Sequence, residues 1–185
     1  SWLGSGDKNI IEFGCGNGRD SRFFHQMGHT VAAVDQFICD DLRNFALETH
    51  NFDAVETSIV DAVGSLKETT DFSTPFTVYS RFFQHAIPAR DQLAMLNNLA
   101  TVLHKDSKLF FEFRLNGDAE NHKEFGTTHF RRFQSADEFK TTLHDTGFNC
   151  IYSCEGYGYA RYKSEDPHVG RFVAVPASNN HLRLV

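Results

Sequence analysis

Asn9-Ile-Ile-Glu-Phe-Gly-Cys-Gly-Asn-Gly18 is the stretch around which the rest of the chain can be interpreted. The apolar residues Ile10, Ile11 and Phe13 run into three glycines at alternate positions, and Arg19-Asp-Ser-Arg-Phe-Phe24 then predicts a helix. A strand, a glycine-rich turn and a helix in this order hold a nucleotide-type ligand at the carboxyl end of a first parallel strand. Glycine adopts positive φ there and lets the backbone approach the ligand closely.

The spacing of these glycines argues against two common nucleotide-binding motifs. A dinucleotide fingerprint has glycines at its first, third and sixth positions, and here the sixth position is Arg19. A Walker loop ends in Gly-Lys-Ser/Thr, which does not follow. The motif is instead Gly-x-Gly-x-Gly, with Glu12 two residues before the first glycine.

Residues 12–18, Glu-Phe-Gly-Cys-Gly-Asn-Gly, resemble motif I of the class I S-adenosylmethionine-dependent methyltransferases. His29-Thr-Val-Ala-Ala-Val-Asp35 resembles the second strand of that family, which ends in an acid that binds ribose. The segments Tyr79–Pro88, Phe111–Arg114 and His129–Phe133 resemble a subgroup associated with bacterial capsule, O-antigen and other surface-glycan clusters. The resemblance covers nearly the whole chain.

This resemblance implies an α/β fold, namely a Rossmann-like seven-stranded sheet of order 3-2-1-4-5-7-6 with the last strand antiparallel and helices on both faces. It also implies S-adenosylmethionine as the cofactor. Twelve positions are then expected to contact this cofactor: Glu12, Gly14, Cys15, Gly16, Asn17, Gly18, Asp20, Asp35, Gln36, Ser58, Ile59 and Ser80.

Length and composition limit the other possibilities. A chain of 185 residues predicts a single domain over 1–185, and the net charge of −6 argues against a nucleic-acid substrate. The four cysteines have neither zinc spacing nor a CxxC pair, so we expect no metal and a cytoplasmic location. The sequence has no run of membrane-spanning length and does not open with a signal peptide.

The first strand is expected to begin at about residue 8, which leaves no room for the lead-in helix that usually precedes it in this family. We interpret Ser1-Trp-Leu-Gly-Ser-Gly6 as the end of a domain excised from a longer protein, possible partners being other glycan-biosynthesis domains. A simply truncated chain is the alternative interpretation.

Hydrophobic periodicity predicts the remaining elements. In the first helix, Phe23, Phe24 and Met27 are expected to form the buried face, and in the helix Asp91–Leu103 the leucines are expected to do so. The expected strands are Thr30–Val34, Asn51–Ser58, Phe76–Ser80, Leu109–Phe113, Phe148–Cys154 and Arg171–Val175, and the other helices are Phe37–Leu47, one from Asp61, and one from the capping box at Ser135 to Gly147.

Two cofactor contacts remain open at this stage. Asp35 lies where it can accept both ribose hydroxyls, or it can serve as a helix N-cap or turn residue. Family members often carry an acid at the end of the third strand for the adenine amino group, but here Ser58 takes that place and Asp61 follows three residues later. Backbone amides near Ile59 and Val60 are the alternative contact for adenine.

Methyl transfer to a hydroxyl is assisted by a general base, and His85 is the first candidate because it follows the fourth strand by five residues. The equally supported alternative is that His85 only shapes the loop. His129, in the segment Arg114–Phe133 that lacks periodicity, is the second candidate.

Arginines are expected to cluster at the mouth of the site. Arg81, Arg114 and Arg131 follow strand ends or precede the last helix, whereas Arg132 is expected to be solvated. Their partners are either an acceptor phosphate or carboxylate, or internal acids such as Glu112 and Asp118.

The resulting hypothesis is O-methylation of an anionic sugar, phospho-sugar or glycan-end acceptor. The alternatives are a small-molecule methyltransferase unrelated to glycans and a cofactor-binding module without chemistry. An oxidoreductase is disfavoured by Arg19 at the sixth fingerprint position.

Overall fold

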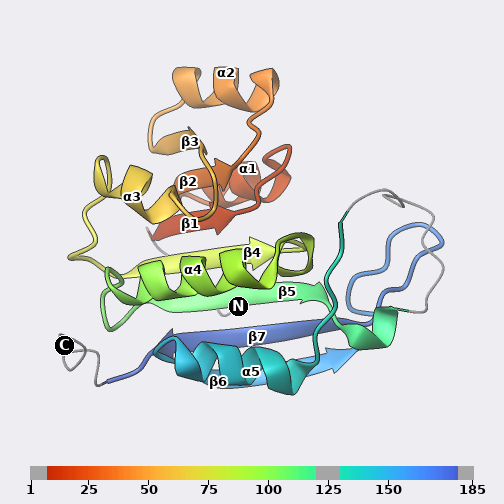
Figure 1. Cartoon of the computed structure of the whole chain (residues 1–185). Helices are drawn as coiled ribbons and strands as arrows, with labels where there is room; N and C mark the ends of the chain where they lie inside the picture. Colours follow the sequence, from red (N-terminus) through yellow and green to blue (C-terminus); the bar gives the residue numbers. More distant parts are fainter. Residues whose placement is uncertain (1–7, 120–129, 179–185) are drawn as a thin grey trace.

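The computed structural model describes residues 8–119 and 130–178 (Figure 1). Three features of the sequence therefore lie outside the described residues: the stretch Ser1–Gly6, the candidate base His129 and the tail Asn179–Val185.

Seven strands form one sheet of order β3-β2-β1-β4-β5-β7-β6, which confirms the predicted fold. The strands β1 to β5 are parallel, and β7 is antiparallel to both β5 and β6. Their bounds are β1 Asn9–Phe13, β2 Thr30–Asp35, β3 Phe52–Glu56, β4 Phe76–Arg81, β5 Lys108–Arg114, β6 Phe148–Gly156 and β7 Val169–Pro176.

Helices cover both faces of the sheet (Figure 1). One hydrophobic cluster joins the sheet to α3, α4 and α5 through residues such as Leu66, Leu96 and Phe139. A second cluster joins the opposite face to α1 and α2 through Phe24 and Leu42. The helix bounds are α1 Arg19–Gln26, α2 Asp40–Glu48, α3 Ala62–Lys67, α4 Ala89–Ala100 and α5 Ala136–Asp145, with 3₁₀ turns η1 Gln84–Ala86 and η2 Asn116–Asp118.

Side-chain hydrogen bonds explain where two helices begin. The predicted capping box is present at α5, where Ser135 Oγ accepts from the Glu138 amide and Glu138 Oε2 accepts from the Ser135 amide. Helix α2 begins at Asp40 rather than at Phe37, because the Asp35 carboxylate takes the Phe37 amide at 3.2 Å. Such local bonds compete with helix formation.

The buried helix faces differ in part from the expectation. In α1, Phe24 is buried, but Phe23 and Met27 are 56% and 62% exposed. In α4 the buried stripe is Gln92, Met95, Leu96 and Leu99, and Leu93 is exposed. The period of 3.6 residues places position 93 beside this stripe rather than on it.

The loops that follow β1 to β5 and the connection between β6 and β7 lie at one edge of the sheet (Figure 1). The carboxyl ends of β1 to β5 meet there, since these strands are parallel. The connection between β6 and β7, residues 157–168, reaches the same edge because β7 runs antiparallel. Ligands of open α/β sheets bind at this edge.

Candidate active site

Two adjoining cavities lie at this edge and share Arg19, Asp20, Arg81 and Phe82 in their walls. The smaller cavity has a volume of about 220 Å³ and is otherwise lined by Glu12, Gly14, Cys15 and Asn17. The larger has a volume of about 660 Å³ and is otherwise lined by Arg114, Arg131, Ala160, Arg161, Tyr162, Glu165 and Pro167.

The glycine loop is shaped for close approach of a ligand. Gly14, Gly16 and Gly18 have φ values of +76°, +55° and +74°, which residues other than glycine rarely adopt. A Cβ on Gly14 would lie 2.3 Å from the Phe83 ring, whereas a Cβ on Gly16 would meet nothing within 4 Å. Gly14 is therefore required by packing, and Gly16 presents bare backbone at an open surface.

Asp35 ends β2 beside this loop. Its Oδ2 accepts a hydrogen bond from the Gly16 amide at 2.9 Å, and its Oδ1 accepts one from the Phe37 amide at 3.2 Å. Each carboxylate oxygen can accept a further hydrogen bond. Asp35 thus forms a turn, which was one of the two roles considered for it, and its carboxylate lies next to the glycine loop with acceptor capacity left.

Glu12 is a buried carboxyl group in the floor of the smaller cavity. Burial raises its pKa to about 7, although a hydrogen bond from the Ser21 hydroxyl acts in the opposite direction. Cys15 is also buried, and burial raises the pKa of its thiol, so this cysteine is held as a neutral group.

Between β3 and α3, Ser58 lies close to Asp61, the residue at the N-cap of α3. Ser58 Oγ donates a hydrogen bond of 2.6 Å to Asp61 Oδ2, so serine and acid form one local unit. Ile59 is partly buried against the core, and Gln36 is exposed next to Asp35. The structure thus places Gln36, Ser58 and Ile59 after β2 and β3, at the same edge as the glycine loop.

A line of alternating charges crosses the sheet from α1 to β7. Arg81 donates to Asp20 at 3.2 Å and to Glu112 at 2.8 Å, and Glu112 also accepts from Arg171 at 2.6 Å. Desolvation opposes ionisation of Asp20, but bonds and charges from Arg19 and Arg81 outweigh it and lower the pKa. Internal acids are therefore partners of Arg81, as one sequence interpretation held.

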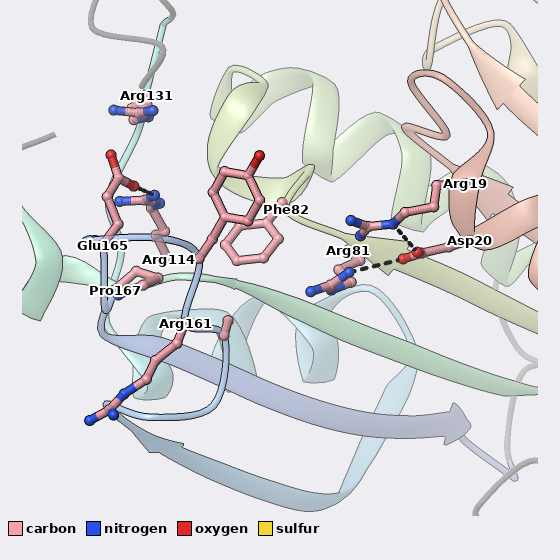
Figure 2. A pocket seen from close by; sticks show the side chains of 11 residues that line it. Arg19, Asp20, Arg81, Phe82, Arg114, Arg131, Arg161, Glu165 and Pro167 are labelled. Atoms are coloured by element: carbon pink, nitrogen blue, oxygen red, sulfur yellow. Dashed lines mark hydrogen bonds and ion pairs between the residues drawn. The ribbon is translucent and has the colours of Figure 1, made fainter. Parts of the chain in front are cut away.

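Arg114 is the centre of a second charged group. Its guanidinium donates to Asp118 at 2.9 Å and to Glu165, and the side chains of both acids are at most 7% exposed. Arg131 lies in the same cavity wall, and desolvation followed by the charge of Arg114 lowers its pKa. Figure 2 shows this group and the Arg19–Asp20–Arg81 group on opposite sides of Phe82.

Phe82 has an unusual backbone at the junction of the two cavities. Its φ of +54° is an outlier for a bulky residue, and its amide donates to the Glu112 carbonyl at 2.7 Å. The Arg81 and Arg114 guanidinium carbons lie 5.3 Å and 6.0 Å from the ring centroid. Strain of this kind is found most often at functional sites.

Two predicted site residues face the interior instead of the cavities. His85 is buried, its Nδ1 accepts a hydrogen bond from the Arg114 amide at 3.3 Å, and it lies outside the lining of both cavities. This geometry corresponds to the loop-shaping interpretation. Ser80 is fully buried, and its hydroxyl accepts from Gln84 Nε2 at 2.9 Å.

Arg132 also differs from its expected solvated state. Its Nη2 donates to Gln92 Oε1 at 2.8 Å, and Gln92 in turn donates to Gln84 at 3.1 Å. The main-chain amide of Arg132 donates to the His85 carbonyl at 2.7 Å. The segment before α5 is thereby fixed to η1 and α4.

Phe82 and Glu165 were missed by the sequence interpretation. A bulky φ outlier has no composition signature, and Glu165 becomes a site residue only through its contact with Arg114. Within the described ranges, 8–119 and 130–178, no group of three or more His, Cys, Asp or Glu side chains is arranged to hold a metal ion. No helix of these ranges is long and apolar enough to cross a membrane.

The fold and the glycine loop together define a Rossmann-like enzyme with a nucleotide-type cofactor site. Residues 3–153 match the model of a family described as a methyltransferase domain. The chain belongs to this family and is an S-adenosylmethionine-dependent methyltransferase. Among curated proteins the sequence has no significant match.

Solved methyltransferase structures share the fold at low sequence identity. The 1,6-didemethyltoxoflavin-N1-methyltransferase of Burkholderia thailandensis has a TM-score of 0.71 at 15% identity, covering 92% of this chain and 72% of that one. A Methanosarcina mazei methyltransferase has a TM-score of 0.69 at 16% identity, covering 92% and 93%. For magnesium protoporphyrin IX methyltransferase of Synechocystis the values are 0.65, 18%, 95% and 78%.

Proposed function

We propose that this methyltransferase transfers the methyl group to an oxygen atom of an anionic acceptor, such as an acidic sugar, a phospho-sugar or a glycan end. The observation that carries the proposal is the larger cavity, which is lined by five arginines and adjoins the glycine-loop cavity. Guanidinium groups are the side chains best suited to carboxylate and phosphate recognition.

Asp20 of the smaller cavity, together with the glycine loop and the residues after β2 and β3 at the same edge of the sheet, fits S-adenosylmethionine. The open backbone at Gly16 admits the ligand, and the Asp35 carboxylate has acceptor capacity for the two ribose hydroxyls. The ionised Asp20 is suited to the ammonium of the methionine part, and Asp61 with Ser58 is suited to the adenine amino group. The bound cofactor supplies an activated methyl group on a sulfonium sulfur.

The larger cavity is the proposed acceptor site. Phe82 belongs to both cavities and is placed to align the acceptor with the methyl group, since methyl transfer depends on alignment of nucleophile, carbon and leaving sulfur. Arg131 is the proposed acceptor contact. Arg81 and Arg114 hold the charged wall in place, because each already bonds to two carboxylates.

The sequence resemblance supports a finer assignment. Tyr79–Pro88, Phe111–Arg114 and His129–Phe133 resemble a subgroup from surface-glycan clusters, so we place the acceptor in glycan biosynthesis. We also propose one methyltransferase domain over 1–185, working with other glycan-biosynthesis domains. The four cysteines are free thiols, which is compatible with a cytoplasmic location.

Isothermal titration with S-adenosylhomocysteine and with NAD tests the cofactor assignment. We expect binding of S-adenosylhomocysteine and none of NAD. Acceptor recognition is then tested with Arg131→Gln, which should raise the KM for an anionic acceptor while the affinity for S-adenosylhomocysteine is kept. Arg90→Gln is the matched control, because Arg90 is highly exposed on α4. If the unchanged protein and both variants methylated neutral sugars as fast as anionic ones, the proposal of an anionic acceptor would be contradicted.

A further inference from the structure

We infer that Glu12 gives up a proton when the methyl donor binds, so that loading of the cofactor depends on pH. This inference rests on the proposed function, because it takes the methionine ammonium of the cofactor to lie beside Asp20 in the smaller cavity. It assigns a role to Glu12, the second acid in the wall of that cavity.

The two acids of the smaller cavity are held differently. Asp20 accepts hydrogen bonds from Arg19 at 3.0 Å and from Arg81 at 3.2 Å (Figure 2). Glu12 is only 3% exposed, and within the described ranges, 8–119 and 130–178, its hydrogen bond comes from the neutral hydroxyl of Ser21. Asp20 is therefore stabilised as an anion by two guanidinium groups, whereas Glu12 is buried beside a neutral donor.

Burial is the main cause that raises the pKa of Glu12 to about 7. On α1, the Ser21 hydroxyl lowers this pKa, the carboxylate of Asp20 raises it, and Arg19 lowers it. On β4, Arg81 lowers it as well. These smaller effects do not offset burial, so the protonated and the ionised forms of Glu12 are both populated near neutral pH.

Three further neighbours of Glu12 are neutral. Tyr79 is its partner in register on β4, and Ala33 is its partner on β2. Burial raises the pKa of the Tyr79 phenol and of the Cys15 thiol, so neither is charged at neutral pH. A buried carboxylate is costly unless its charge is compensated. A cation that enters the smaller cavity therefore meets an acid whose ionised form is poorly compensated by its surroundings.

The methionine part of the cofactor supplies such a cation. Glu12 and Asp20 line one cavity of about 220 Å³, so an ammonium beside Asp20 also lies near Glu12. A nearby opposite charge lowers the pKa of a carboxyl group by about one to three pKa units. The O–H bond of Glu12 then breaks, its electron pair stays on oxygen, and the buffer takes up the proton. The new carboxylate compensates the charge of the ammonium.

The affinity for the cofactor should consequently rise with pH. The pKa of Glu12 is about 7 in the free protein and lower in the complex, so the ligand favours the ionised form. The affinity therefore rises as the pH approaches about 7 and is constant above it. Each pKa unit by which binding lowers the pKa of Glu12 corresponds to about a tenfold gain in affinity.

Calorimetric titration with S-adenosylhomocysteine, which carries the same ammonium, measures the released proton. The heat of binding depends on the ionisation enthalpy of the buffer that takes the proton up, so phosphate and imidazole buffers are compared. At pH 6.5 we expect release of about 0.5–0.8 proton per ligand bound. Glu12→Gln should lose this release, because glutamine keeps an oxygen acceptor for Ser21 but has no proton to lose. Asp53→Asn, at an exposed acid on β3, is the matched control and should keep it.

The affinities provide a second measurement. The Kd of the unchanged protein for S-adenosylhomocysteine should fall about tenfold from pH 5.5 to pH 8. Glu12→Gln should keep the weaker affinity throughout this range. Ser21→Ala removes the hydrogen bond that lowers the pKa of Glu12, so it should move the proton release to higher pH.

The possible failures are distinguishable. Equal proton release by the unchanged protein and Glu12→Gln, or an affinity of the unchanged protein that does not vary with pH, would overturn the inference and leave the cofactor site in place. If S-adenosylhomocysteine did not bind at any pH from 5.5 to 8, the proposed function itself would be contradicted.

Discussion

The Gly16 amide donates a 2.9 Å hydrogen bond to the Asp35 carboxylate, which joins the glycine loop to the end of β2 across nineteen residues. Asp35→Ala removes both this bond and the acceptor for ribose. We expect the binding free energy of S-adenosylhomocysteine to become less favourable by about 1–3 kcal/mol, which is the usual cost of leaving polar groups unpaired. Titration calorimetry measures it. Asp53→Ala, an exposed acid on β3, is the control, and equal affinities of the two variants would show that the ribose is held elsewhere.

Glu12 should make the stability of the fold depend on pH. Its pKa is about 7 in the folded protein against an ordinary 4.5, so the folded state binds the proton more tightly than the unfolded state does. The free energy of unfolding should therefore fall by roughly 3–4 kcal/mol in all as the pH rises from about 4.5 to about 7, and should then level off.

Glu12→Gln should remove this part of the pH dependence, because glutamine has no proton to lose. Urea unfolding of both proteins at pH 5 and pH 8 gives the four free energies needed. The free energy of unfolding of Glu12→Gln, measured relative to that of the unchanged protein, should be higher at pH 8 than at pH 5. An identical difference at both pH values would mean that Glu12 titrates normally in the folded protein.

Phe82 allows backbone strain to be separated from ring packing. Phe82→Ala and Phe82→Gly both remove the ring, but only glycine adopts a φ of +54° without strain. We expect Phe82→Gly to be more stable than Phe82→Ala by about 1 kcal/mol in urea unfolding. If alanine proved the more stable of the two, the backbone at this position would not be strained.

Arg114 should be required for stability because it neutralises two buried acids. Arg114→Met leaves Asp118 and Glu165 buried and without their guanidinium partner, which typically costs 3–5 kcal/mol. The loss should shrink at a pH low enough to protonate the two acids. Urea unfolding at neutral and acidic pH measures both effects, and Arg90→Met on the surface of α4 should change little. A small loss of stability that does not depend on pH would contradict this role of Arg114 as the partner of Asp118 and Glu165.

His85 should affect stability rather than proton transfer. His85→Ala leaves the buried Arg114 amide without the Nδ1 acceptor, at a cost of about 1–3 kcal/mol. His85→Asn supplies an oxygen acceptor near the same position and should recover part of that loss. Both variants should keep the pH profile of methyl transfer. A profile that flattens in both variants would restore His85 as the general base.

Local patterns predicted the unit of β1, the glycine loop and α1, and the place of Asp35 at the end of β2. Asp35 was placed correctly because its position follows from the strand and glycine spacing within one short segment. The acceptor side depends on pairing between distant segments. The partner of Arg114 is Glu165, 51 residues later, and Phe82 is held by a hydrogen bond to Glu112 in the neighbouring strand. Neither relation has a local sequence pattern, so both had to come from the three-dimensional structure.

The burial of individual side chains was the second property that the sequence did not predict reliably. Phe23 on α1 and Met27 at its C-cap were expected to be buried because they are apolar, yet both are exposed, unlike the buried Phe24. In contrast, Arg132 was expected in solvent because two adjacent arginines do not easily point inward, yet it bonds to Gln92. Residue type is a weak guide to burial when helix orientation and polar partners decide it.

The connection between β6 and β7 supplies Ala160, Arg161, Tyr162, Glu165 and Pro167 to the larger cavity and nothing to the smaller one. If the larger cavity binds the acceptor as proposed, acceptor choice is encoded largely in one short run of codons, remote in the gene from those of the glycine loop. Insertions and substitutions in surface connections are tolerated far better than changes in the strands that they join. A lineage can thus acquire new acceptors by mutation of this run while selection preserves the methyl-donor site. An engineer can follow the same route by grafting the connection from one family member onto another.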